Sequence, residues 1–228
     1  MKLFFSFLFS LFFTGIVFSN EIPVNIQPDF DIINKNLLTD ERYELMKSYA
    51  KQHYNMDHAN LVDPKMIVVH FTAIPNLELS LRAFEFKEIP YQRERLHAQG
   101  KANVGTHYLI DKNGDIYQLY PTTVMVRHVI GFNHTALAIE IVASGEDAIR
   151  MAQIQATIKL IHYLSLRYPS IEYLIGHMEY MNQTYDHFNL FLELNKDYEP
   201  SIKMDPGFTT MRRIRQYLER DYKLILKK

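Results

Sequence analysis

A short apolar strand that ends in a histidine constrains this chain more than any other feature. Met66 to Val69 are all apolar, and they lead directly into His70, Phe71 and Thr72. A run of this kind predicts a buried central strand of a sheet. Ligands gather at the carboxyl ends of strands in open α/β sheets, so His70 stands where chemistry is expected.

A second stretch repeats this design. Residues 171–177 read Ile-Glu-Tyr-Leu-Ile-Gly-His, so that another mainly apolar run ends in a histidine, His177. Two strands of this kind can bring their terminal histidines to the same edge of a sheet. We therefore expect His70 and His177 to lie close together.

The rest of the chain alternates helix and strand patterns around these two strands. Asn113-Gly114 lies between two strand patterns and predicts a hairpin over residues 106–120. Further periodic patterns predict a strand over residues 135–143 and helices over residues 39–53, 79–87, 146–168 and 208–228. A strand, a crossover helix and another strand indicate an α/β fold. We expect a central mixed β-sheet flanked by helices.

Three stretches show no clear period. Residues 20–38 contain two prolines and are expected to form an extended arm. Residues 91–99 are expected to form a lid or a cleft wall, and residues 178–202 a long loop with a short helix. Loops of such length in a compact domain are usually functional or mobile. Substrate selectivity is therefore expected in residues 76–102 and 178–202.

The N-terminal residues have the pattern of a targeting segment. Residues 1–19 carry Lys2, then an almost unbroken apolar block, and end in small residues. The pattern predicts a secretory signal peptide, and the alternative is a membrane anchor, because the block has a length that suits both. We expect cleavage near Ser19 and an exported protein, periplasmic or secreted. An arm and packing helix over residues 20–62 and one α/β domain over residues 63–228 would follow.

Composition limits the partners of the mature chain. Without Lys2, 24 of the 25 basic residues remain against 26 acidic ones, a formal charge of −2, which does not suggest nucleic acid as a partner. The chain has no cysteine, so its stability must come from its core and not from disulfides. No second hydrophobic span follows residue 19, and we expect a monomer with no transmembrane segment in the mature chain.

The two histidines suggest a metal site that needs a third protein ligand. A catalytic zinc site takes three protein ligands and leaves a fourth position open. Asp205, in the sequence Lys-Met-Asp-Pro-Gly at residues 203–207, is the best candidate. Asp-Pro-Gly is also an ordinary turn sequence in which the aspartate binds its own backbone. On sequence chemistry alone, the turn is favoured.

Six motifs in order change this balance. They occupy residues 68–72, 105–114, 127–134, 138–141, 176–177 and 203–207. The set resembles the zinc-dependent N-acetylmuramoyl-L-alanine amidases of the type 2 amidase family, whose fold is shared with phage lysozyme-like amidases and peptidoglycan recognition proteins. The resemblance covers roughly Met66 to Leu218. One departure is the connection between the last two motifs, residues 178–202, which is longer than is usual in the family.

The resemblance implies a role for each residue of the site. His70, His177 and Asp205 would bind zinc, with a carboxylate where other members of the family use cysteine. Glu140 would act as the general base, and its apolar neighbours would raise its pKa toward the working range. Lys203 would stabilise the oxyanion of the tetrahedral intermediate.

Each of these roles has a structural alternative. Glu140 could be a buried carboxylate paired with a basic residue, and Lys203 a solvated loop residue. The resemblance places His107, His128 and Asn133 in the cleft wall, where they would contact sugar or peptide. A purely structural role for these three residues is an equal alternative.

The function implied by the resemblance is hydrolysis of the amide between N-acetylmuramic acid and L-alanine in peptidoglycan or muropeptides, for cell-wall degradation, remodelling or recycling. One alternative is a non-catalytic peptidoglycan-binding protein, against which the three candidate ligands argue. Another is a metallopeptidase that cuts within the stem peptide. Zinc chemistry serves any amide, so the sequence does not separate these bonds.

Overall fold

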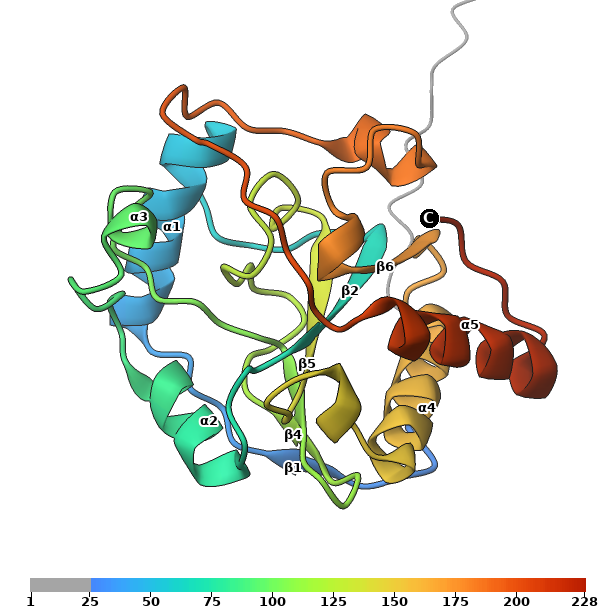
Figure 1. The fold of residues 1–228 in the computed structure, drawn as a ribbon. Helices are drawn as coiled ribbons and strands as arrows, with labels where there is room; N and C mark the ends of the chain where they lie inside the picture. The colour runs from blue at the N-terminus through green and yellow to red at the C-terminus, as the bar shows by residue number, and fades with distance from the viewer. Residues whose placement is uncertain (1–25) are drawn as a thin grey trace, which may run out of the picture.

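A six-stranded sheet forms the centre of the computed structural model, which describes residues 26–228 (Figure 1). The strands are β1 (Ile32–Asn34), β2 (Met66–Phe71), β3 (Tyr108–Ile110), β4 (Ile116–Gln118), β5 (Ala136–Ile141) and β6 (Tyr173–Gly176). Their order is β1-β4-β3-β5-β2-β6, and only the β3–β4 hairpin is antiparallel. The predicted mixed sheet flanked by helices is confirmed. The expected signal peptide, residues 1–19, lies outside the described residues.

Strand β2 owes its apolar sequence to its place between two parallel neighbours. It pairs with β5 on one side and with β6 on the other. The side chains of Met66 to Val69 have no exposed surface, as expected for a strand covered on both faces. The register places His70 beside Glu140 of β5 and Val69 beside Gly176 of β6. The next residue after β6 is His177, so the sheet itself assembles the candidate site.

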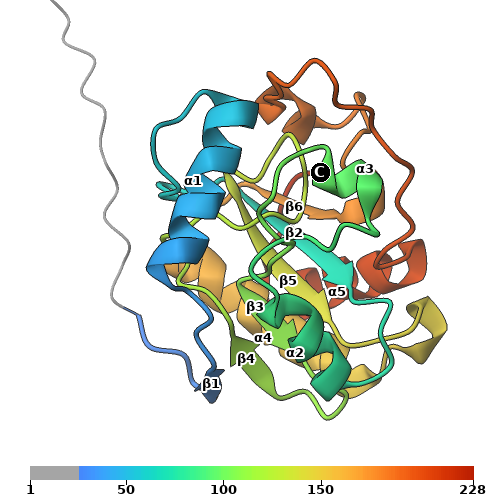
Figure 2. The same ribbon diagram turned by 90° about the vertical axis from the view of Figure 1, so that its left-hand side faces the viewer.

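Helices cover both faces of the sheet (Figures 1 and 2). Their bounds are α1 (Asp40–Tyr54), α2 (Leu77–Glu85), α3 (Glu94–His97), α4 (Met151–Arg167) and α5 (Phe208–Tyr222), with short 3-10 turns η1 (Glu146–Ala148), η2 (His177–Glu179) and η3 (Asp186–Leu190). Helices α4 and α5 lie on one face, and α1 and α2 lie toward the other. The candidate site lies on the α2 face, because His70 and Glu140 alternate with residues that point toward α4.

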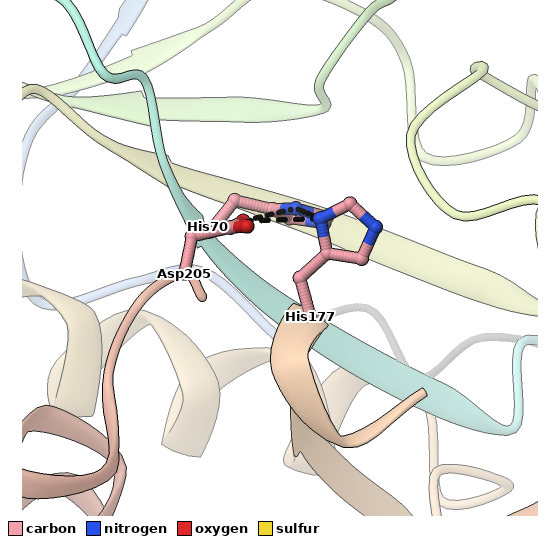
Figure 3. A group of neighbouring side chains, drawn as sticks. All are labelled: His70, His177 and Asp205. Carbon is pink, nitrogen blue, oxygen red and sulfur yellow. Dashed lines mark hydrogen bonds and ion pairs between the residues drawn. The ribbon is translucent and has the colours of Figure 1, made fainter. Parts of the chain in front are cut away.

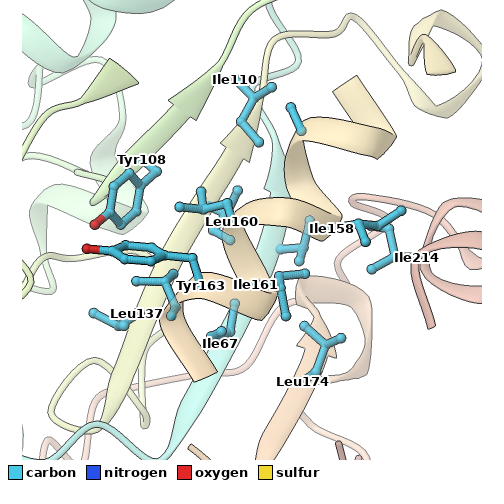
Figure 4. Close-up of a cluster of buried hydrophobic side chains, with 14 of the residues drawn as sticks. Ile67, Tyr108, Ile110, Leu137, Ile158, Leu160, Ile161, Tyr163, Leu174 and Ile214 are labelled. Carbon is cyan, nitrogen blue, oxygen red and sulfur yellow. The ribbon is translucent and has the colours of Figure 1, made fainter. Parts of the chain in front are cut away.

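The largest apolar cluster lies between the sheet and helices α4 and α5 (Figure 4). Ile67 of β2 and Leu137 of β5 contribute to this cluster from the sheet, and Leu160 contributes from α4. All three side chains are fully buried. The cluster therefore supports one face of the sheet, and the candidate site lies on the other face.

Three segments differ from the sequence prediction at their ends. The arm over residues 20–38 contributes an edge strand, β1, and helix α4 starts at Met151, after the separate turn η1. Helix α5 ends at Tyr222 because Lys223 adopts a left-handed conformation, with φ of 55°. The residues after it return to the sheet, where Lys227 forms a bridge with Tyr173 at the edge of β6.

The N-terminal elements belong to the same body as the rest of the described chain. Strand β1 pairs with β4, and Tyr49 of α1 packs in a cluster with Met125. A boundary between an arm at residues 20–62 and a domain at residues 63–228 stays a prediction. Within residues 26–228, no helix combines the length and the apolar character that crossing a membrane requires.

We predict that Leu160→Ala lowers the free energy of unfolding by about 2–5 kcal/mol, because it removes a buried side chain between α4 and the sheet. Leu166→Ala on the same helix is the matched control. Leu166 is 46% exposed, and its truncation should change stability by less than about 0.5 kcal/mol. Urea denaturation of both variants measures the difference. Equal losses would contradict the assigned core.

Candidate metal centre

Two histidines and an aspartate from three separate segments meet at the carboxyl end of the central strands (Figure 3). His70 lies near the end of β2, His177 follows β6, and Asp205 precedes α5. His70 Nδ1 lies 3.0 Å from His177 Nδ1 and 3.2 Å from Asp205 Oδ2. The distance between His177 Nδ1 and Asp205 Oδ2 is 3.0 Å. The expected proximity of the two histidines is confirmed, and the third candidate ligand joins them.

Backbone contacts on both sides of Asp205 fix the loop that carries it. The backbone N–H of Met178 donates to the carbonyl of Asp205 over 2.8 Å, which joins the loop to the turn after His177. On the other side, Gly207 has φ of +100°, and a Cβ there would lie 2.4 Å from the carboxylate oxygens of Glu146. Glu146 accepts from the N–H of Thr210 in the first turn of α5 over 2.7 Å. It therefore caps this helix in place of the missing side chain of Gly207.

His128 lies next to His70 and determines which nitrogen of the neutral His70 ring carries the hydrogen. His128 Nε2 lies 3.4 Å from the carbonyl oxygen of Ala136, and His128 Nδ1 lies 3.0 Å from His70 Nε2. Because a carbonyl can only accept, His128 donates from Nε2 and accepts at Nδ1 from His70. His70 Nδ1 is then free of a proton and points its lone pair toward His177 and Asp205. A partner of this kind commonly orients a metal-binding histidine.

The donor set fits a zinc ion. Burial, and then the neighbouring His70, lower the pKa of His177 to about 4, so this imidazole is neutral near pH 7 and can donate a lone pair to a metal. Zinc is bound by histidine nitrogen and carboxylate oxygen at about 2.0–2.2 Å, and tetrahedral ligands are then about 3.3 Å apart. The spacings of 3.0 to 3.2 Å at this site are close to that value.

Glu140 is the carboxylate closest to this group on the sheet. It is paired in register with His70, and its Oε2 atom is buried without a hydrogen-bond partner among the described residues. Burial raises its pKa to about 7, and the charge of Asp205 adds to this effect against the opposing effect of His70. The expected rise in pKa is therefore present, and no basic residue forms an ion pair with Glu140 in the described part of the chain.

The ligand group opens into a cavity of about 640 Å³. Glu140, His128 and Lys203 line this cavity together with residues of α3. Lys203 is half-buried, and burial lowers its pKa. The expectation that residues 91–99 form a cleft wall agrees with the structure, because Arg93, Leu96 and Gln99 are among the lining residues.

Two predicted contact residues lie outside this cavity. His107 is fully buried, accepts from the N–H of Ala138 over 2.9 Å and donates to the carbonyl of Val124 over 3.0 Å. Asn133 is also fully buried, and its side chain binds backbone and tyrosine groups. The structure differs here from the expected substrate contacts, because neither side chain has a free polar atom to offer. Of the three, only His128 lines the cavity.

Sequence reasoning gave no role to the arginine before His128. Arg127 is 2% exposed and donates to the carbonyl oxygens of Leu96, Gly100 and Ala102 over 2.7 to 2.9 Å. It also lies over the ring of Tyr49. Arg127 therefore holds the wall that contains α3 in place. Only its position in the Arg-His motif could have indicated it, because a buried arginine has no periodic signature.

Comparison with protein families gives one match. The family model described as N-acetylmuramoyl-L-alanine amidase matches residues 60–190, more than half of the chain. The matched range includes two of the candidate ligands and Glu140, and it ends before Lys203 and Asp205. No curated protein is similar enough in sequence to match this chain.

Solved structures with a similar fold come from several sources. Bumblebee PGRP-SA has a TM-score of 0.54 at 17% identity, covering 85% of this chain and 97% of that one. The N-acetylmuramoyl-L-alanine amidase LysC from Clostridium intestinale URNW has a TM-score of 0.43 at 22% identity, covering 68% and 87%. The endolysin of Thermus scotoductus MAT2119 bacteriophage Ph2119 has a TM-score of 0.46 at 19% identity, covering 82% and 99%. The similarity to bumblebee PGRP-SA supports the fold.

We predict that His128→Phe weakens zinc binding by about 10- to 100-fold, because His70 loses the acceptor that orients it. Competition with a chelator measures the affinity. His162→Phe is the matched control, since His162 stacks on Tyr222 and lies outside the cavity lining. Equal affinities of the wild type and His128→Phe would remove His128 from this role.

We predict that acid destabilises the fold partly through His107. Burial lowers its pKa from 6.5 to about 4, so below pH 6.5 the unfolded chain binds a proton that the folded chain does not. Stability is therefore lost as the pH falls from 6.5 toward 4, by about 2 kcal/mol at pH 5 from this residue. In His107→Gln, the amide can keep both hydrogen bonds without titrating. Urea denaturation at pH 7 and pH 5 should show a smaller loss for this variant than for the wild type, and an identical loss would contradict the assignment.

Proposed function

The chain belongs to the N-acetylmuramoyl-L-alanine amidase family, and we propose on this basis that it is a zinc-dependent amidase of peptidoglycan. The bond cleaved is the amide between N-acetylmuramic acid and L-alanine. The observation that carries the proposal is the meeting of His70, His177 and Asp205 beside Glu140, in a cavity large enough for part of a muropeptide.

Each residue of the site has a part in this reaction. A zinc ion held by His70, His177 and Asp205 would supply Lewis-acid chemistry at the scissile amide. Glu140 takes a proton from the attacking water and delivers it to the leaving amine, a task for which a pKa of about 7 is suited. Lys203 donates to the oxyanion of the tetrahedral intermediate, since its ammonium group lines the same cavity.

The alternatives are weaker on the same observations. A non-catalytic peptidoglycan-binding protein does not need three converging ligands and a carboxylate with a raised pKa. A metallopeptidase acting within the stem peptide would use the same chemistry, and membership of the family favours the first amide. We also propose that the protein acts outside the cytoplasm, because residues 1–19 have the sequence pattern of a signal peptide.

The proposal is tested by mass spectrometry of the products from purified peptidoglycan. With zinc, residues 20–228 should release stem peptides that have a free N-terminal L-alanine, and a chelator should abolish this release. Binding without any cleavage would favour a recognition protein. Release of shorter peptides that lack this N-terminus would favour a metallopeptidase.

We predict that Glu140→Gln lowers the rate by about 10²- to 10⁴-fold, because the amide cannot accept the proton. Zinc affinity should stay close to that of the wild type, since Glu140 is not among the three ligands. Glu78→Gln on α2 is the matched control, because its side chain is 75% exposed and lies outside the cavity lining. A rate unchanged in Glu140→Gln would exclude this residue as the base.

A further inference from the structure

Residues 191–201, here called the bridge, cross from η3 to the far wall of the cavity and return toward α5. In Figures 1 and 2 this segment runs from the orange turn η3 to the region of α1 and α3 before it descends to α5. Its contacts decide the shape of the cavity at this end.

A buried pair joins the start of the bridge to α1. His53 Nδ1 lies 2.7 Å from Glu193 Oε2, and the two side chains are 0% and 5% exposed. His53 Nε2 lies 2.9 Å from the carbonyl oxygen of Gln99, and the N–H of Leu194 donates to the carbonyl of His53 over 2.9 Å. Before this point, Phe191 packs against Gly131, where a Cβ would lie 2.3 Å from its ring. The bridge is therefore fixed where it leaves the core.

The tip of the bridge meets the wall that carries α3. Asn195 Nδ2 donates to Gln99 Oε1 over 2.7 Å, and Gln99 Nε2 donates to the carbonyl of Asp197 over 3.1 Å. Arg95 and Glu199 approach within 3.7 Å. Gln99, Asp197, Arg95 and Glu199 all line the cavity. Because opposite walls touch here, the cavity is closed at this end.

Tyr180 contacts the part of the bridge that returns toward α5. Tyr180 Oη lies 3.1 Å from Tyr198 Oη, and it accepts from the N–H of Ser201 over 3.0 Å. Tyr180 is 2% exposed and lies next to His177, with ring centroids 5.4 Å apart. The bridge is thus attached both to the α1 side and to the metal side of the cavity, which is the arrangement of a fixed wall.

Charged side chains of both signs line this end of the cavity, with Arg93 and Arg95 near Asp197 and Glu199. Arg93 lines the cavity, and no ion pair or side-chain hydrogen bond engages its guanidinium within residues 26–228. The charges that act on Lys203 are those of Asp205, Arg93 and Arg95. Asp205 lies in the ligand group with the two histidines, and Arg95 has only the distant contact with Glu199. Among the described residues, Arg93 and Lys203 are the cations of the cavity lining without an ion pair or a side-chain hydrogen bond, and Arg93 is the one to which the proposed reaction gives no role.

The geometry points to a carboxylate subsite at the closed end of the cavity, in which Arg93 binds the free C-terminal carboxylate of a stem peptide. A substrate that enters a closed end must terminate there, and a peptide terminus carries the anion that an unpaired guanidinium binds best. The inference rests on the proposed amidase function and narrows its substrate to stem peptides that are not cross-linked through this terminus. The glycan extends through the open side.

Calorimetry on the zinc-loaded Glu140→Gln protein tests this subsite without hydrolysis. The ligands are two muramoyl tripeptides that differ only in a C-terminal carboxylate or carboxamide. The carboxylate should bind about tenfold more tightly, the gain expected for one hydrogen-bonded charge pair at an accessible site. A third ligand is extended by two residues beyond this terminus. It should bind no more tightly than the carboxamide, because the bridge leaves no space for the added residues.

Adding Arg93→Gln to this protein should reduce the preference for the carboxylate to less than twofold. Arg220→Gln is the matched control, because Arg220 pairs with Asp221 on the exposed end of α5, and it should leave the tenfold preference intact. Equal binding of the carboxylate and the carboxamide, a preference that survives Arg93→Gln, or tight binding of the extended ligand would each overturn the inference. If the wild type shows no hydrolysis and the preference is present, only the amidase reaction is excluded.

Discussion

The parallel pairing of β2 with β5 and β6 is the constraint on which the rest of the structure depends. This pairing places Glu140 beside His70 and brings His177 to the end of the adjacent strand. Backbone hydrogen bonds within the sheet set these positions, so they do not depend on the conformation of a long loop. Of the three candidate ligands, only Asp205 is neither in a strand nor directly after one, and the N–H of Met178 and the capped start of α5 restrict its loop. Backbone contacts therefore position all three members of the ligand group.

The sequence predicted the parts of the site that follow from strand order. Apolar runs that end in His70 and His177 indicate strand ends, and the motif order indicated Asp205. The contacts of His107 and Asn133 were not predictable, because a polar residue next to a strand gives the same sequence signal whether it faces a cleft or the interior. In the structure both are buried and hydrogen-bonded to nearby groups. The ends of α4 and α5 depend on single-residue conformations, such as that of Lys223, which periodicity does not contain.

A layer of buried polar groups connects the rigid sheet to the irregular cavity walls. Arg127 holds three backbone carbonyls of the wall that carries α3, and the His53–Glu193 pair holds the bridge against α1. Unpaired, such groups would be costly to bury, so each supports a defined loop position. Long connections in this fold thereby acquire fixed shapes without regular secondary structure. Their sequences carry no period because their partners are distant in the chain.

The last residues of the chain protect the sheet from self-association. Strand β6 lies at the edge of the sheet, and such an edge offers unpaired backbone groups to any other extended chain. Here Lys227 lies beside Tyr173, accepts from the N–H of Leu174 over 2.9 Å, and donates to the carbonyl of Glu172 over 2.9 Å. The segment that contains Lys227 thus pairs with the backbone groups of β6 that would otherwise be exposed at the edge of the sheet. Removing it, or displacing it with a fused tag, would leave a template for intermolecular strand pairing and would favour aggregation of an otherwise well-packed protein.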